Sequence, residues 1–203
     1  MFKTMCRCPP TCHNRVSQHG IKIPLEIFKT GNKGWGVRSL SSISSGSFVC
    51  EYAGEVLQEN GDEHVETDEY LFDIGHHYHD EVWEDPKFEG ILGLESSTSK
   101  TTEDTEGSKT TEDTEGSTID ASKCSNVGRF INHSCSPNLY AQNVLWDHDD
   151  MKKPHIMFFA TENIPPLQEL TYDYNYGKVE DKNGKEKVKP CFCGSPDCSR
   201  RLY

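Results

Sequence analysis

The stretch RFINHSCSPN, residues 129–138, is the part of the sequence that decides the fold. Two apolar residues, Phe130 and Ile131, are followed by an amide, an imidazole, a hydroxyl and a thiol. Polar groups that enter a core must be hydrogen-bonded, because an unpaired buried polar group destabilises the fold. The stretch is therefore either a strand that ends in a Ser-Pro turn or a buried segment that binds something. The tripeptide at 132–134 also matches an N-glycosylation acceptor.

Composition and charge narrow the class of protein. The chain has 203 residues, of which 33% are hydrophobic, so we expect one domain with part of the chain outside the core. The net charge of −12 argues against a sequence-independent DNA-binding protein and is compatible with a basic partner. The longest apolar run, Ile156 to Ala160, is far shorter than the roughly 20 residues of a membrane span. The N-terminus lacks the apolar core of a signal peptide, so we expect an intracellular protein with no membrane association.

The cysteines indicate metal binding. Six of the nine form two similar clusters at the ends of the chain, which are Cys6, Cys8 and Cys12, and Cys191, Cys193 and Cys198. In an intracellular protein such clusters favour zinc over disulfides. Three thiolates do not complete a tetrahedral site, so each cluster needs a fourth ligand. His13 is a candidate, although an ordinary exposed histidine is preferred there, and His148 and His155 show no ligand spacing.

Hydrophobic patterns predict a mostly β protein. Residues 21–27 alternate apolar and polar residues, residues 48–56 and 69–74 suggest further strands, and residues 156–160 suggest a fully buried strand. Alternation over residues 169–176 predicts a strand with its tyrosines on one face. Short helices are possible within 60–70 and 77–94. Residues 100–108 are repeated without change as 109–117, and such a polar repeat predicts a disordered acidic insert at 95–118.

The motifs GWGVR, EYAGE, EYLFD, RFINHSCSPN, ELTYDY and CxCxxxxC occur in this order. Together they resemble the SET-domain protein lysine methyltransferases, and more narrowly the plant SU(VAR)3-9-type, KRYPTONITE-like histone H3 lysine-9 methyltransferases. The resemblance covers the chain except 95–118. It implies a SET-domain fold of small curved β-sheets with a C-terminal pseudoknot. It also implies a truncated pre-SET zinc remnant at 1–18, a SET domain at 19–177 and a post-SET zinc segment at 187–203.

The same resemblance implies an activity and its partners. The cofactor is S-adenosylmethionine, and the reaction is methyl transfer to a lysine amine. The expected substrate is the histone H3 tail, the expected partner chromatin and the expected location the nucleus, with no DNA-binding domain in this chain. Two alternatives stay open: a catalytically impaired SET module with a scaffolding role, and a methyltransferase for a non-histone lysine.

The resemblance also assigns roles to residues. Cofactor binding falls to Gly34, Trp35, Gly36, Tyr70, Arg129, Asn132, His133, Tyr174 and Phe192. Tyr174 matches the catalytic tyrosine, Tyr70 lines the lysine channel or cofactor pocket, and Tyr172 matches a Phe/Tyr switch that favours mono- and dimethylation. Cys135 joins Cys191, Cys193 and Cys198 around one zinc ion, while Cys6, Cys8 and Cys12 belong to the pre-SET remnant. From the residues alone, the tyrosines could instead be strand aromatics that pack on the core, and Cys135 a buried free thiol.

Overall fold

The computed structural model describes residues 8–58, 70–74, 117–148, 150, 153–176 and 184–203. The predictions for Cys6, for helices within 60–69 and 77–94, and for most of the acidic repeat lie outside these residues. No helix in the described part of the chain is long and apolar enough to cross a membrane.

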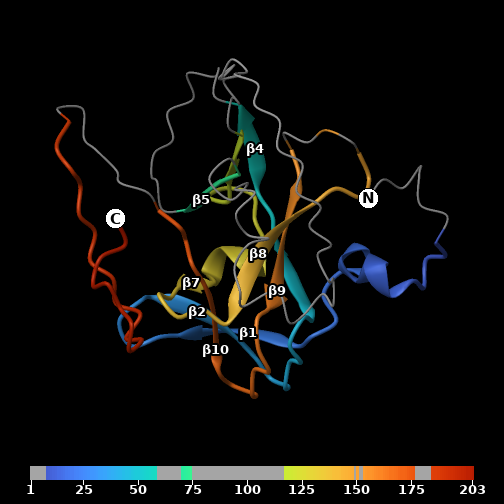
Figure 1. Ribbon diagram of the computed structural model, residues 1–203, viewed down its shortest axis with the longest axis horizontal. Coiled ribbons are helices and arrows are strands. Elements are labelled where there is room, and N and C mark those ends of the chain that lie inside the picture. The colour runs from blue at the N-terminus through green and yellow to red at the C-terminus, as the bar shows by residue number, and fades with distance from the viewer. Residues whose placement is uncertain (1–7, 59–69, 75–116, 149, 151–152, 177–183) are drawn as a thin grey trace, which may run out of the picture.

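Three small sheets make up the fold (Figure 1). The first has the order β1-β2-β10-β7, the second β3-β9-β8 and the third β4-β6-β5. Of two 3-10 helices, η1 (His13–His19) precedes the first strand and η5 (Val127–Phe130) lies between β6 and β7. The strand bounds are β1 (Leu25–Lys29), β2 (Trp35–Ser39), β3 (Phe48–Tyr52), β4 (Glu55–Gln58), β5 (Leu71–Asp73), β6 (Ser117–Asp120), β7 (Asn132–His133), β8 (Leu139–Val144), β9 (His155–Ala160) and β10 (Glu169–Tyr172).

The first sheet places the functional stretch. β10 lies between β2 and β7, and it pairs antiparallel with β2 but parallel with β7. The parallel register sets Thr171 beside Asn132 and Tyr172 beside His133. Residues 129–133 enter this pairing from η5, whose first turn is capped by the Asn126 side chain accepting from the Gly128 backbone N–H at 2.9 Å. The stretch thus leads from η5 into the first sheet, with Ile131 buried and its neighbours half-buried.

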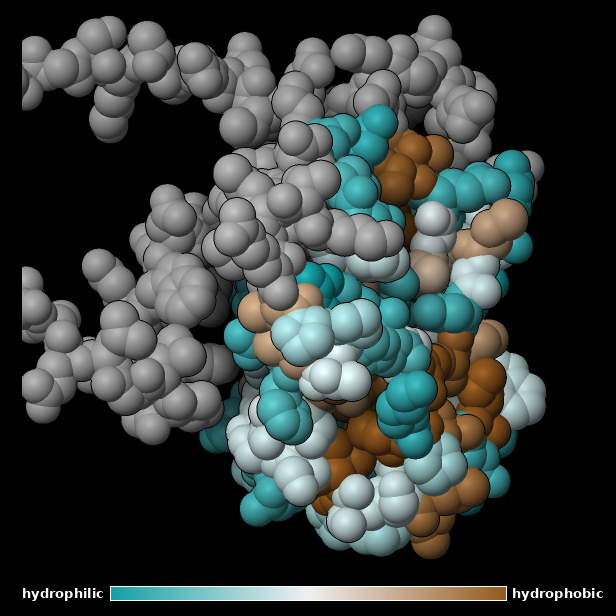
Figure 2. Space-filling model, turned by 90° about the vertical axis from the view of Figure 1, so that its right-hand side faces the viewer, coloured by the Kyte–Doolittle hydropathy of each residue, from teal (hydrophilic) through white to brown (hydrophobic). Residues whose placement is uncertain are grey.

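The core consists largely of residues from the central strands. β9 is buried at Ile156, Met157, Phe158 and Ala160, which confirms the strand predicted at 156–160. Figure 2 shows one face of the molecule, where apolar residues gather in the lower part among polar ones. Some large apolar side chains stay exposed, and Leu167 is 55% exposed with a backbone φ of 67°.

Two predicted strands are longer than the observed ones. The alternation at 21–27 predicted a strand from Ile21, but β1 begins at Leu25. Pro24 precedes it, and proline has no backbone N–H to donate to a ladder. The strand predicted at 169–176 ends at Tyr172 instead, and Asn175 adopts a φ of 49° that breaks the extended path.

Candidate functional site

A polar network joins three strands of the first sheet at one end of a cavity. The Asn132 side-chain amide donates to the Trp35 carbonyl and to Glu169 Oε1, both at 2.9 Å. Lys33 Nζ donates to Glu169 Oε2 at 2.7 Å. Both carboxylate oxygens of Glu169 are therefore engaged. Neither Lys33 nor Glu169 was predicted as a site residue, although Lys33 directly precedes the motif GWGVR and Glu169 begins the motif ELTYDY.

The glycines of GWG permit this close packing. Gly34 has a φ of +79°, a conformation that residues with a Cβ rarely adopt. A Cβ on Gly36 would stand 2.8 Å from Thr30 Cγ2 and 3.0 Å from Glu169 Oε1. Gly36 thus serves the sheet packing behind the Glu169 network rather than the cavity wall.

His133 lies between Tyr174 and Cys135. Its Nδ1 accepts the backbone N–H of Tyr174 at 3.2 Å, and its Nε2 lies 3.3 Å from Cys135 Sγ. Burial lowers the pKa of His133 and outweighs the opposing effect of nearby Asp173. The imidazole is therefore neutral at pH 7, with the Nδ1 lone pair used by the backbone and Nε2 as the N–H.

Tyr174 and Tyr172 occupy two layers of one wall. The Tyr174 hydroxyl donates to the Ile131 carbonyl at 3.0 Å, and burial raises its pKa, so it stays protonated. Tyr172 lies behind it, with ring centroids 4.7 Å apart, and packs against Phe158 at 4.7 Å. Burial also raises the pKa of Tyr172. Tyr172 is a core residue in contact with Tyr174, so the core-packing alternative describes its position.

Arg129 and Tyr70 form the opposite wall. The Arg129 guanidinium lies over the Tyr70 ring, 4.0 Å from its centroid. Arg129 Nη1 also donates to the Ser122 carbonyl at 3.1 Å, which holds the guanidinium in place. The Tyr52 hydroxyl donates to the Tyr70 carbonyl at 2.8 Å and fixes the backbone from which that ring projects.

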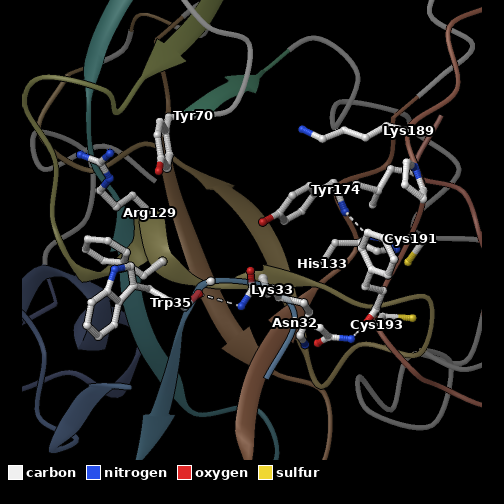
Figure 3. A pocket seen from close by; sticks show the side chains of 16 residues that line it. Asn32, Lys33, Trp35, Tyr70, Arg129, His133, Tyr174, Lys189, Cys191 and Cys193 are labelled. Carbon is white, nitrogen blue, oxygen red and sulfur yellow. Dashed lines mark hydrogen bonds between the residues drawn. The ribbon is translucent and has the colours of Figure 1, made fainter. Parts of the chain in front are cut away.

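These walls enclose a cavity of about 510 Å³, shown in Figure 3. Eight of the nine predicted cofactor residues line it, namely Gly34, Trp35, Tyr70, Arg129, Asn132, His133, Tyr174 and Phe192. Gly36 and Tyr172 do not line it. The hydroxyls of Tyr70 and Tyr174 face the space between the two rings (Figure 3).

The C-terminal segment closes the cavity with residues that the sequence did not point out. Lys189 and Leu202 line it, and Lys189 extends toward Tyr174 in Figure 3. Asn32 joins the lining from the other side, where its side-chain amide donates to the Phe192 carbonyl at 3.4 Å. The residue types of Lys189, Leu202 and Asn32 do not by themselves indicate a binding site. These residues reach the cavity only because the C-terminal segment folds back over it.

Four cysteines meet beside the cavity. The sulfur atoms of Cys135, Cys191, Cys193 and Cys198 all lie within 4.8 Å of one another, and those of Cys135 and Cys191 are 3.9 Å apart. Zinc–sulfur bonds of about 2.3 Å in a tetrahedron place sulfur atoms about 3.8 Å apart, so the four thiols fit a zinc ion. Burial would raise the pKa of Cys193, but hydrogen bonds from the Cys135 backbone and from Ser195 lower it to about 5.

Within the described residues, the N-terminal cysteines form no comparable group. Cys8 is exposed and Cys12 half-buried, and neither belongs to a cluster of described ligand residues. His13, the candidate fourth ligand, begins η1 and belongs to no such cluster either. A metal role for Cys8 and Cys12 stays a prediction.

Comparisons with known proteins agree with this architecture. The SET domain matches residues 34–175. The chain is 55% identical over 202 residues to the H3 lysine-9 specific histone-lysine N-methyltransferase SUVH6 of Arabidopsis thaliana, and 54% identical over 201 residues to SUVH5 of the same plant. These alignments cover 98% of this chain but 24% and 21% of the relatives. The chain therefore spans about a quarter of the length of the curated relatives that it matches.

Solved structures agree as well. Arabidopsis thaliana SUVH6 in complex with SAM matches with a TM-score of 0.77 and 52% identity, over 100% of this chain and 38% of that one. KRYPTONITE in complex with mCHH DNA, an H3(1-15) peptide and SAH matches with a TM-score of 0.71 and 36% identity, over 100% of this chain and 35% of that one. The predicted mostly β fold of small sheets is confirmed, and the chain belongs to the SET-domain family.

Proposed function

We propose that this chain transfers a methyl group from S-adenosylmethionine to the side-chain amine of a histone H3 lysine, with lysine 9 the first candidate. One observation carries the proposal: eight residues assigned to cofactor binding, Tyr174 among them, come from separate parts of the sequence and line a single cavity. The names of SUVH6 and SUVH5, and the structures of relatives with SAM, SAH and an H3 peptide, support it.

The cavity is suited to the cofactor. Its volume of about 510 Å³ falls within the roughly 300–1,000 Å³ of small-molecule sites. Trp35, Tyr70 and Phe192 offer aromatic surface for a flat base and for a sulfonium cation. Asn132 and His133 are held by the hydrogen bonds described above, so they meet a ligand already oriented.

When bound, S-adenosylmethionine supplies a methyl group on a positively charged sulfur. The residues of this chain align the lysine amine with that methyl group in a space shielded from water. We assign this alignment to Tyr174, whose neutral hydroxyl projects toward the cavity from a position fixed by Ile131. Its raised pKa makes it unsuited to act as a base, so the lysine must lose its proton to water.

We assign one zinc ion to Cys135, Cys191, Cys193 and Cys198, where it would hold the segment that carries Lys189, Phe192 and Leu202 against the cavity. The division into a pre-SET remnant at 1–18, a SET domain at 19–177 and a post-SET segment at 187–203 belongs to the same proposal. So do mono- and dimethylation as the products, attributed to Tyr172, and the nucleus as the location.

Mass spectrometry of a histone H3 tail peptide after incubation with the chain and S-adenosylmethionine tests the proposal. We expect mass increases of one and two methyl groups on the native peptide, and none on a peptide with arginine in place of lysine 9. A chain that binds no cofactor and modifies neither peptide would leave the scaffolding alternative. A chain that binds the cofactor but modifies neither peptide would leave the non-histone lysine as the alternative. Methylation of both peptides would refute lysine 9 as the target.

A further inference from the structure

A second group of ligating side chains lies far from the cavity, at the loop end of the β8–β9 hairpin. Asp147, His148 and His155 each contribute one ligand atom, and these atoms lie within 4.8 Å of one another. None of the three lines the cavity. Figure 1 shows the end of this hairpin, in orange, on the opposite side of the molecule from the red C-terminal segment with its cysteines.

The hairpin register brings together residues that show no ligand spacing along the chain. β8 pairs with β9 so that Val144 stands opposite His155, and the intervening loop returns Asp147 and His148 to the start of β9. His155 Nε2 lies 2.9 Å from Asp147 Oδ1, and His148 Nε2 lies 3.6 Å from the same oxygen. Four-coordinate zinc with bonds of about 2.0–2.1 Å separates its ligand atoms by about 3.3–3.4 Å, which is between these two distances.

Glu51 supports His155 from the neighbouring strand. Glu51 in β3 pairs with Met157 in β9, so the Glu51 side chain is a diagonal neighbour of His155 on one face of the sheet. His155 Nδ1 donates to Glu51 Oε1 at 2.8 Å. A carboxylate that accepts from one nitrogen of a histidine orients the other nitrogen, and this arrangement is common behind metal ligands.

We propose that Asp147, His148 and His155 form a zinc site, with Glu51 orienting His155 and water in the remaining position. Two imidazoles and one carboxylate are a ligand set that zinc accepts. The site is separate from the four-cysteine group and independent of the proposed methyltransferase activity. Its ion would tie the end of the hairpin to β9 and, through Glu51, to β3.

Without metal, the same residues form a different arrangement. His155 then donates through both ring nitrogens, to Glu51 and to Asp147, which requires a doubly protonated ring. Zinc would replace the proton on Nε2. His148 Nδ1, which accepts the Asp150 backbone N–H at 3.2 Å, would have to release that contact and carry a proton.

Equilibrium dialysis of the full chain against zinc chloride, under reducing conditions, tests the site. Zinc per chain is compared between the native protein and His148→Gln at the same free zinc concentration, so the ions held by cysteines cancel in the difference. We expect the native protein to bind one more zinc than His148→Gln. Glu51→Gln should weaken this additional ion by about 10–100-fold. Asp150→Asn, in the same loop but outside the ligand set, should bind like the native protein.

The nitrogen-15 spectrum of the histidine rings gives a readout that needs no variant. On zinc addition, the His155 Nε2 signal should change from that of an N–H to that of a metal-bound nitrogen, while Nδ1 keeps its proton. Equal zinc content in the native protein and His148→Gln would overturn the proposal. So would a His155 ring that stays doubly protonated at saturating zinc.

Discussion

The Glu169 carboxylate accepts a hydrogen bond from the Asn132 side-chain amide at 2.9 Å, across 37 residues of sequence. The other oxygen of the carboxylate pairs with Lys33 at 2.7 Å. The orientation of Asn132 toward the cavity therefore depends on a residue that does not line it. Glu169 is a positioning residue, and its substitution should weaken binding of the proposed cofactor.

Glu169→Gln keeps the shape of the side chain but removes its charge. We expect the dissociation constant of S-adenosylmethionine to rise about 10- to 100-fold, because Asn132 and Lys33 lose a charged partner, which is worth about 1.5–3 kcal/mol. Isothermal titration of the cofactor measures this change. Glu26→Gln, which breaks the Arg38 ion pair on the same sheet, is the matched control and should leave the affinity unchanged. Equal affinities for both variants would contradict the positioning role.

Gly36→Ala should destabilise the first sheet. The added methyl would stand 2.8 Å from Thr30 and 3.0 Å from Glu169, and such overpacking costs about 1–3 kcal/mol in the free energy of unfolding. Denaturant unfolding measures the loss. Gly31→Ala is the matched control, since a Cβ there meets no described atom within 4 Å. A Gly36→Ala protein as stable as Gly31→Ala would show that the sheet relaxes around the methyl group.

Tyr174→Phe should reduce turnover by at least about 100-fold, the size of losing a positioned transition-state hydrogen bond, while the fold persists. Circular dichroism and methyl transfer to an H3 peptide separate the two effects. Tyr176→Phe serves as the control, because Tyr176 packs edge-on against Tyr174 at 5.6 Å but does not line the cavity. Similar turnover in both variants would show that the Tyr174 hydroxyl does not contribute to the reaction.

The rate should rise with pH through the alkaline range. The substrate lysine, with an ordinary pKa near 10.4, must be neutral to attack, so more of it is reactive as the pH rises. Burial raises the pKa of Tyr174, and its hydroxyl therefore stays protonated over the same range. A profile of kcat/KM against pH measures this behaviour. A falling rate that coincides with the ultraviolet signal of tyrosinate would be inconsistent with a neutral Tyr174.

Tyr172→Phe should shift the product toward trimethylation. Tyr172 is buried behind Tyr174, so loss of its hydroxyl frees space in the wall against which the amine is held. Mass spectrometry gives the ratio of mono-, di- and trimethylated peptide. The phenyl ring that remains at position 172 should keep its packing on Phe158, and an unchanged melting temperature would show this. A product ratio equal to that of the native chain would end the switch interpretation.

Cys135→Ser should remove one zinc ion per chain and most of the activity. The cysteine group anchors the segment that brings Phe192 and Leu202 to the cavity, so its loss opens one wall. Metal analysis and methyl transfer measure both effects. Cys124→Ser replaces an exposed thiol outside the group and should change neither. Full activity in zinc-depleted Cys135→Ser would show that methyl transfer does not require this zinc ion.

The sequence predicted the elements whose residues carry their own pattern. The buried strand at 156–160 is apolar throughout, and the cysteine spacing near the C-terminus predicted the group that Cys135 joins. Contacts of residues to which no motif assigned a role were missed. Lys33 and Glu169 meet only because β10 lies beside β2, and His155 meets Asp147 only through the hairpin. Gly36 was expected at the cofactor, since a glycine needed for packing and one needed for ligand approach look alike in sequence.

The parallel pairing of β7 with β10 has a consequence for the order of folding. Asn132 and His133 obtain their strand partners only after Thr171 and Tyr172 have entered the sheet, and the cavity closes only after residues 189–193 return. Such non-local contacts require long loops to close before any stabilisation is gained, so they form slowly. The proposed cofactor site would thus be absent from a nascent chain until residues 189–193 have left the ribosome, so partly made copies would not carry out the proposed methyl transfer.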